Sequence, residues 1–76
     1  MDVSHRHPAT QHIARYFEYE HLKTPLRGIS LLSHDLAEQM IRDVPDGPEL
    51  TAGLRKLLEA KDCFVRAALE INKSNL

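Results

Sequence analysis

The segment Val44-Pro45-Asp46-Gly47-Pro48 constrains the fold more than any other part of the sequence. Proline cannot continue a helix and glycine tolerates unusual backbone angles, so this short segment is predicted to be a tight turn. Together with Pro25 it divides the chain into an arm and two long helical stretches. The predicted boundaries are 1–23 for the arm, 24–76 for a helical hairpin, and about 25–43 and 48–71 for its two helices. Because so few residues join these helices, we expect them to be antiparallel neighbours.

Both predicted helices carry an apolar stripe at helical spacing. Thr24 is placed to cap the first helix, and Pro25 suits its first turn. The stripes comprise Leu26, Ile29, Leu32, Leu36, Ala37, Met40, Ile41 and Val44 in the first helix, and Leu50, Leu54, Leu57, Leu58, Phe64, Val65, Ala68, Leu69 and Ile71 in the second. The second stripe covers about 160° of the helix surface, more than one partner helix can bury. We therefore expect an all-α fold whose hairpins assemble as a homo-oligomer.

The arm holds both tyrosines and one of the two phenylalanines of the chain. Ile13, Tyr16, Phe17 and Tyr19 are predicted to form the apolar side of a short helix that starts near Pro8. We expect Phe17 to cover the open end of the hairpin core. The two tyrosines suit that role and the stacking of a nucleobase equally well.

Charge and cysteine content exclude several classes of protein. Ten basic and eleven acidic residues give a net charge of −1, without the basic face that binders of DNA or RNA polymers normally carry. Cys63 is the lone cysteine, which suits a reducing compartment. The sequence shows no apolar leader and no run long enough to span a bilayer. We expect a cytoplasmic protein that binds neither nucleic-acid polymers nor membranes.

Two features of the second helix suggest binding of an anion. Lys61 lies near the middle of the apolar stripe, where it either extends past its neighbours to solvent or a hairpin carboxylate, or faces a phosphate in a pocket between subunits. Thr51 and Arg55 lie one turn apart near the helix N-terminus, where a hydroxyl, a guanidinium and free N–H groups can bind an anion. The commoner interpretation of Arg55 is a solvated residue that pairs with Glu59.

Neither a metal site nor catalysis is expected. The chain has five histidines, but His5 and His7 lie in a terminus that we expect to be flexible, and no cysteine pair accompanies them. His34 shares one helix face with acidic residues, as solvated helices commonly do, and nothing supplies a nucleophile. We therefore predict a protein without metal, cofactor or enzymatic activity.

The chain from about 16 to 69 resembles a family of small phage hairpin proteins, the anti-CBASS and anti-Thoeris cyclic-nucleotide sponges. The matching motifs are FEYEHL at 17–22, Leu36-Ala37 in the first helix, PDGPE at 45–49 and LRKLLEAKD at 54–62. The block in the second helix is the more specific part of the resemblance.

The resemblance implies a hexamer of interlocked hairpins in the cytosol of a bacterial host. Such proteins bind cyclic di- or trinucleotides, or cyclic ADP-ribose-like ligands, without cleaving them, and so silence an immune effector. Tyr19 is the best candidate for stacking on a base, and Tyr16 is the second. Thr51 and Arg55 match a threonine–arginine pair that lines a separate pocket on the symmetry axis.

Leu31 departs from this pattern, because relatives often carry a lysine there that grips phosphate. Arg27 or His34 is then the substitute phosphate partner, or this pocket is lost while the site at Thr51 and Arg55 persists. The alternative function is a helical module that binds another protein and no nucleotide. An exposed apolar patch around Leu31 would favour that alternative.

Overall fold

The computed structural model describes residues 1–24 and 26–74 of the chain, with the side chains described up to residue 69. Its elements in chain order are α1 (Pro8–Ala14), the short 3₁₀ helix η1 (Arg15–Phe17), α2 (Leu26–Asp43) and α3 (Pro48–Ser74). No strand occurs in these two ranges. The all-α class is therefore confirmed.

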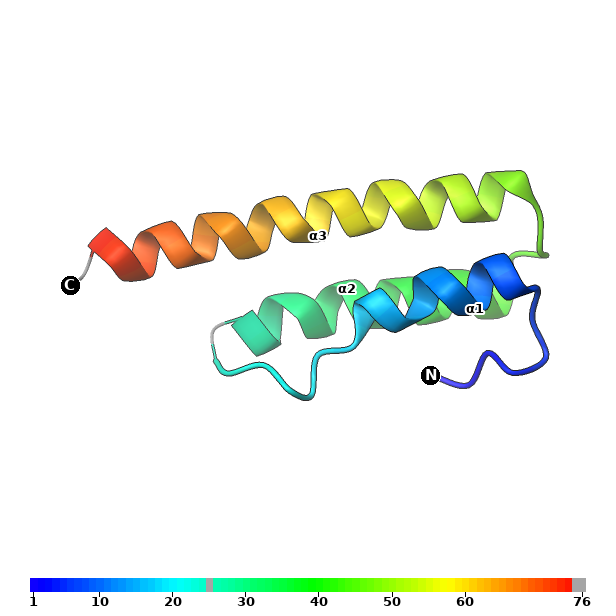
Figure 1. Ribbon diagram of the computed structural model, residues 1–76, viewed down its shortest axis with the longest axis horizontal. Helices are drawn as coiled ribbons and strands as arrows, with labels where there is room; N and C mark the ends of the chain where they lie inside the picture. Colours follow the sequence, from blue (N-terminus) through cyan, green and yellow to red (C-terminus); the bar gives the residue numbers. More distant parts are fainter. Residues whose placement is uncertain (25, 75–76) are drawn as a thin grey trace.

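Helices α2 and α3 run antiparallel beside one another, and α1 lies alongside them (Figure 1). The turn begins and ends where the prolines predict, because α2 ends at Asp43 and α3 begins at Pro48. Helix α3 continues past its predicted end near Ile71 to Ser74. The predicted cap of α2 involves Pro25, which lies outside the described residues. At about 1.5 Å per residue, the 27 residues of α3 account for most of the 44 Å length of the molecule.

The hydrophobic core lies where α1 and η1 meet the hairpin. Phe17 has no exposed surface, in agreement with its predicted role over the hairpin core. The buried apolar residues of this cluster are Ile13, Ala14, Phe17, Ala37, Ile41, Leu50 and Leu54. The short N-terminal elements therefore complete a core that two helices alone would leave open.

The buried face of α2 differs from the stripe that the sequence predicts. Ser30, Ser33, Ala37 and Ile41 are the buried residues of this helix, whereas Leu32 is 74% exposed. Both η1 and α3 pack on α2, and small side chains let helices approach closely. Ala37 and Ile41 of the predicted stripe are buried, whereas Leu32, Leu36 and Met40 are exposed.

The residues before α1 are tied to the α2–α3 turn, contrary to the flexible terminus expected around His5 and His7. Arg6 donates hydrogen bonds to the backbone carbonyls of Ile41 and Val44 at the end of α2. Its guanidinium also lies 2.9 Å from a carboxylate oxygen of Asp46. Free carbonyls at a helix C-terminus need donors, and a guanidinium offers several in a fixed arrangement.

Candidate functional site

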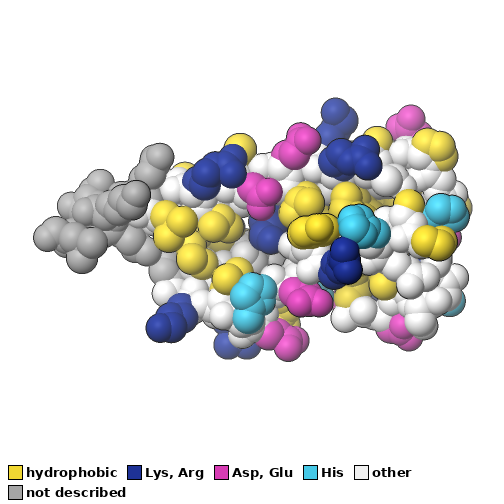
Figure 2. Space-filling model, in the orientation of Figure 1, with side chains coloured by type: hydrophobic (Ala, Val, Ile, Leu, Met, Phe, Trp, Pro, Cys, Tyr) yellow, Lys and Arg dark blue, Asp and Glu magenta, His cyan; other side chains and the backbone are white. Residues whose placement is uncertain are grey.

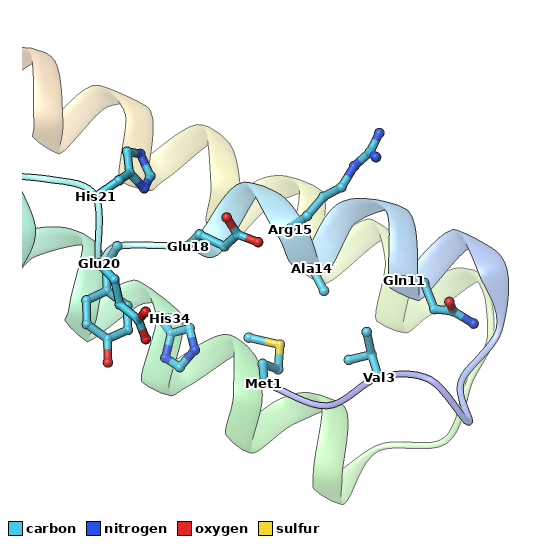
Figure 3. A pocket seen from close by; sticks show the side chains of 10 residues that line it. Met1, Val3, Gln11, Ala14, Arg15, Glu18, Glu20, His21 and His34 are labelled. Atoms are coloured by element: carbon cyan, nitrogen blue, oxygen red, sulfur yellow. The ribbon is translucent and has the colours of Figure 1, made fainter.

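A cavity of about 540 Å³ opens between the N-terminal segment, α1, the loop after η1 and α2. Figure 3 shows Glu18, Glu20 and His34 on one side of this space and Met1 and Val3 on another. The full lining is Met1, Val3, Gln11, Ala14, Arg15, Glu18, Tyr19, Glu20, His21 and His34. It combines the phenol ring of Tyr19 and the imidazoles of two histidines with charged groups of both signs.

Tyr19 reaches this cavity because η1 ends at Phe17, two residues before it. Glu18 leaves the 3₁₀ helix in an extended conformation, with φ of −62° and ψ of 141°. The Tyr19 ring then lies edge to face with the ring of His34, with 4.9 Å between centroids and 65° between planes. The guanidinium carbon of Arg27 lies 5.8 Å from the centroid of the same tyrosine ring. Three residues that the sequence proposed for ligand binding are thus brought together.

His34 is held in place by two carboxylates from its own helix. Its Nδ1 lies 3.1 Å from Asp35, and its Nε2 lies 3.6 Å from Glu38. The His34 side chain is only 14% exposed. With both ring nitrogens directed at carboxylates, His34 is suited to orient Tyr19 rather than to donate to a phosphate. Of the two substitutes predicted for the missing lysine, Arg27 is the better placed.

Leu31 lies outside the cavity lining and is half-buried. It is therefore neither part of an exposed apolar patch nor a group that faces the cavity. The exposed apolar residues of α2 are instead Leu32, Leu36 and Met40. The position of Leu31 consequently favours neither nucleotide capture nor the binding of another protein.

Tyr16 lies apart from the cavity, on the outer side of η1. Its side chain is 50% exposed, and its ring makes an edge contact with His12 at 5.8 Å between centroids. Lys61 donates a hydrogen bond of 2.6 Å to the backbone carbonyl of Tyr16. This bond joins η1 to α3, so Lys61 has a structural partner that is neither a hairpin carboxylate nor a ligand.

Thr51 and Arg55 lie in the first turns of α3 and do not line the cavity. The Thr51 hydroxyl donates to the carbonyl of Gly47 at 3.2 Å, within its own helix turn. Arg55 is exposed, and the described residues show no ion pair between it and Glu59. One copy of the chain therefore does not join these two residues to the Tyr19 cluster.

Sequence reasoning missed the charged residues around Tyr19. Arg15, Glu18, Glu20 and His21 all line the cavity, although only Tyr19 and His34 among its lining residues were proposed to bind a ligand. The sequence carried no clear signal for them, because adjacent residues of an extended segment point to opposite sides, and the turn that begins at Glu20 brings these side chains to one cavity.

Within the described ranges, no group of three or more His, Cys, Asp or Glu side chains is arranged to hold a metal ion. None of the helices described is both long and apolar enough to cross a bilayer. Comparison with known proteins gave no family model, no curated protein and no solved structure that matches the chain. The resemblance to the phage sponges consequently stays a prediction.

Proposed function

We propose that this chain captures a cyclic oligonucleotide second messenger in the bacterial cytosol without cleaving it. By lowering the free concentration of the messenger, it would act as a phage sponge against CBASS- or Thoeris-type immune signalling. The observation that carries the proposal is the placing of Tyr19, with Arg27 beside its ring, at the edge of a cavity of about 540 Å³. That volume falls within the range of about 300–1,000 Å³ usual for small-molecule sites.

The chemistry of this cluster suits a nucleotide. An aromatic ring offers a stacking surface worth about 1–3 kcal/mol per base. Arg15 lines the cavity and Arg27 lies at its edge, so two guanidinium groups are available to pair with phosphate oxygens. Capture requires only high affinity, stoichiometric amounts of protein and slow release, so no nucleophile or metal needs to be present.

We include self-association in the proposal because apolar side chains of α2 and α3 form a strip that the rest of the described chain does not cover. Leu32 is 74% exposed and Phe64 is 61% exposed. Two apolar grooves on α2 and α3 share Leu36 and Leu57 and so run into one another. Figure 2 shows hydrophobic side chains gathered on the surface near the C-terminal end of α3. In the hexamer that the resemblance implies, packing of the copies against one another would cover this strip.

Assembly would also give Thr51 and Arg55 a role that one copy does not provide. Both lie near the N-terminus of α3 on a partly or fully exposed surface. Where such surfaces from several copies meet, hydroxyl and guanidinium groups converge on one axis. A cyclic trinucleotide would then have a second site separate from the Tyr19 cavity.

Thermal unfolding in the presence of candidate ligands tests the proposal. Cyclic dinucleotides, cyclic trinucleotides and a cyclic ADP-ribose are each added at high micromolar concentration. A bound ligand at 1,000 times its Kd raises the free energy of unfolding by about 4 kcal/mol. The ligand recovered after denaturation is expected to be chemically unchanged. If no member of the panel stabilises the protein, capture of such messengers is rejected.

The two tyrosines provide matched variants for this experiment. We expect Tyr19→Ala to remove most of the ligand-induced stabilisation, because it deletes the phenol ring of the cavity that is proposed to stack on a base. Tyr16→Ala removes an equal side chain outside the cavity and should leave that stabilisation nearly unchanged. Loss of binding in Tyr16→Ala alone would show that the ligand lies elsewhere.

The apolar strip also favours a second candidate function, a module that binds a different protein. Exposed apolar surface of this kind is a common mark of protein–protein interfaces. Capture of one partner from cell extract without added nucleotide, at fixed stoichiometry, would support this function. For this function to hold, the Phe64→Glu variant must fail to bind that partner, and the Tyr19→Ala variant must still bind it.

A further inference from the structure

We propose that the Tyr19 cavity selects a guanine base over an adenine base, through the carboxylates of Glu18 and Glu20. This inference rests on the proposed capture of a cyclic nucleotide and specifies which messengers the cavity would hold. It concerns two residues that flank Tyr19 and line the cavity with it.

The two glutamates are available to a ligand. Both side chains are exposed, and neither takes part in an ion pair within the described part of the chain. Figure 3 shows both of them at the cavity, on the segment that links η1 to α2. Because both glutamates line the same cavity as Tyr19, a base stacked on its ring would have its edge within the reach of their side chains.

A phosphate group alone does not suit this lining. The acidic and guanidinium side chains that line the cavity are two carboxylates, of Glu18 and Glu20, and one guanidinium, that of Arg15, and Met1 also lines it. The carboxylates would repel a free phosphate, so the ligand needs hydrogen-bond donors as well as negative charge. A nucleotide provides both, because its phosphates can face Arg15 and Arg27 while its base faces the glutamates.

Among the bases, guanine fits a carboxylate best. An ionised carboxylate only accepts hydrogen bonds, and its two oxygens suit a pair of parallel donors. The Watson–Crick edge of guanine presents such a pair, the N1–H and the exocyclic amine. The same edge of adenine presents one amine next to the lone pair of N1, which would face a carboxylate oxygen and be repelled. Sites that bond a particular edge reject ligands whose edge leaves those groups unpaired.

Titration of the assembled protein with three cyclic dinucleotides tests this proposal. The ligands are cyclic di-GMP, cyclic di-IMP, which lacks the exocyclic amines, and cyclic di-AMP. For the unmodified protein we expect the tightest binding for cyclic di-GMP, weaker binding for cyclic di-IMP, and at least tenfold weaker binding for cyclic di-AMP than for cyclic di-GMP.

In the double variant Glu18→Gln with Glu20→Gln, each carboxylate, whose two oxygens only accept hydrogen bonds, is replaced by an amide. A glutamine side chain offers one donor beside one acceptor, which matches adenine rather than guanine. We expect the preference for cyclic di-GMP over cyclic di-AMP to fall by about tenfold or to reverse. Glu59→Gln, an exposed glutamate of α3 outside the cavity, is the matched control and should leave the preference unchanged.

The outcomes separate this inference from the proposed function. If none of the three ligands, nor any other cyclic nucleotide, binds the unmodified protein, the proposed function itself fails. If cyclic dinucleotides bind but cyclic di-AMP binds as tightly as cyclic di-GMP, only the guanine selection is overturned. The same holds if the double variant keeps the guanine preference, because the glutamates would then not be its source.

Discussion

Arg6 and Asp46, forty residues apart in the sequence, form an ion pair of 2.9 Å between the N-terminal arm and the α2–α3 turn. The same carboxylate accepts hydrogen bonds from the backbone N–H of His7 and the hydroxyl of Thr10, each at 3.1 Å. One aspartate thereby fixes the start of α1. Because Val3 precedes this anchor and lines the cavity, the geometry of the cavity depends on the turn.

Arg6→Ala is expected to lower the free energy of unfolding by about 2–3 kcal/mol, since it removes charged hydrogen bonds to two carbonyls at the end of α2. In a domain of this size that loss corresponds to a fall in Tm of about 10 °C or more. Circular dichroism during heating measures it. We expect the Tm of Arg6→Lys to lie between those of the unmodified protein and Arg6→Ala, because an ammonium cannot reproduce the planar guanidinium.

Lys56→Ala is the control for this prediction, because it removes an exposed cation of α3. It should change Tm by no more than a surface substitution usually does, within about 0.5 kcal/mol. Equal effects of Arg6→Ala and Lys56→Ala would contradict a structural role for the arm.

The contribution of Asp46 to stability should depend on pH. The hydrogen bond from Arg6 is the main cause that lowers the pKa of Asp46 below its ordinary value of 3.8. The unfolded chain then binds more protons than the folded one between these two pKa values, so stability rises with pH in that window. The contribution is present above the ordinary pKa and is lost as the pH falls through the lowered one.

Urea unfolding of the unmodified protein and of Asp46→Asn, from neutral pH down to strongly acidic pH, measures this effect. We expect the difference between the two proteins to shrink only once the pH falls below about 4. The hydrogen bonds from Ser4 also lower the pKa of Asp2, but this contribution is the same in both proteins and cancels. A difference that stays constant across the acidic range would rule out the ion pair as its origin.

Ser30→Ala is expected to stabilise the protein by about 1 kcal/mol. The Ser30 hydroxyl is buried without a hydrogen-bond partner among the described residues, and such burial is unfavourable. Ser33→Ala is the matched control, because Ser33 is also buried in α2 but donates to the carbonyl of Ile29 at 3.4 Å. Chemical denaturation of both variants measures the difference. An equal gain in both would mean that helix propensity alone explains it.

Leu32→Glu and Phe64→Glu are each expected to prevent the proposed self-association, so that the protein remains a single chain. Both side chains are largely exposed in one copy, so the substitutions should leave the helical content of the hairpin unchanged. Native mass spectrometry gives the number of subunits, and Lys56→Glu provides a control with a new carboxylate away from the strip. An unmodified protein that sediments as a monomer at all concentrations would contradict self-association.

The hairpin itself could be predicted from the sequence because its boundaries depend on local effects. Pro45 and Pro48 limit the helices by their own covalent geometry, whatever the rest of the chain does. The buried face of α2 could not be predicted in the same way. Periodicity identifies an apolar stripe, but Ser30 and Ser33 are also buried, because the covered side of α2 depends on how the rest of the chain packs against it.

The candidate site was predictable only in part. Tyr19 and Arg27 were proposed from motif and position, and the structure brings them within 5.8 Å. The acidic neighbours of His34 on its own helix were predicted, but its contact with the Tyr19 ring was not, because that contact depends on how the loop after η1 folds against α2. Arg6 was overlooked for a similar reason: a basic residue near a chain end gives no sign that a helix C-terminus lies opposite it.

The bond between the arm and Asp46 also has a practical consequence for protein engineering. Loop tips between helices are normally the first choice for a peptide tag, a fluorophore or a circularly permuted terminus. Here such an insertion would displace a carboxylate that holds three separate donors of the arm. A reporter placed in this turn would therefore disturb the cavity beside Val3, so labels belong instead on the outer surface of α3, at positions such as Lys56.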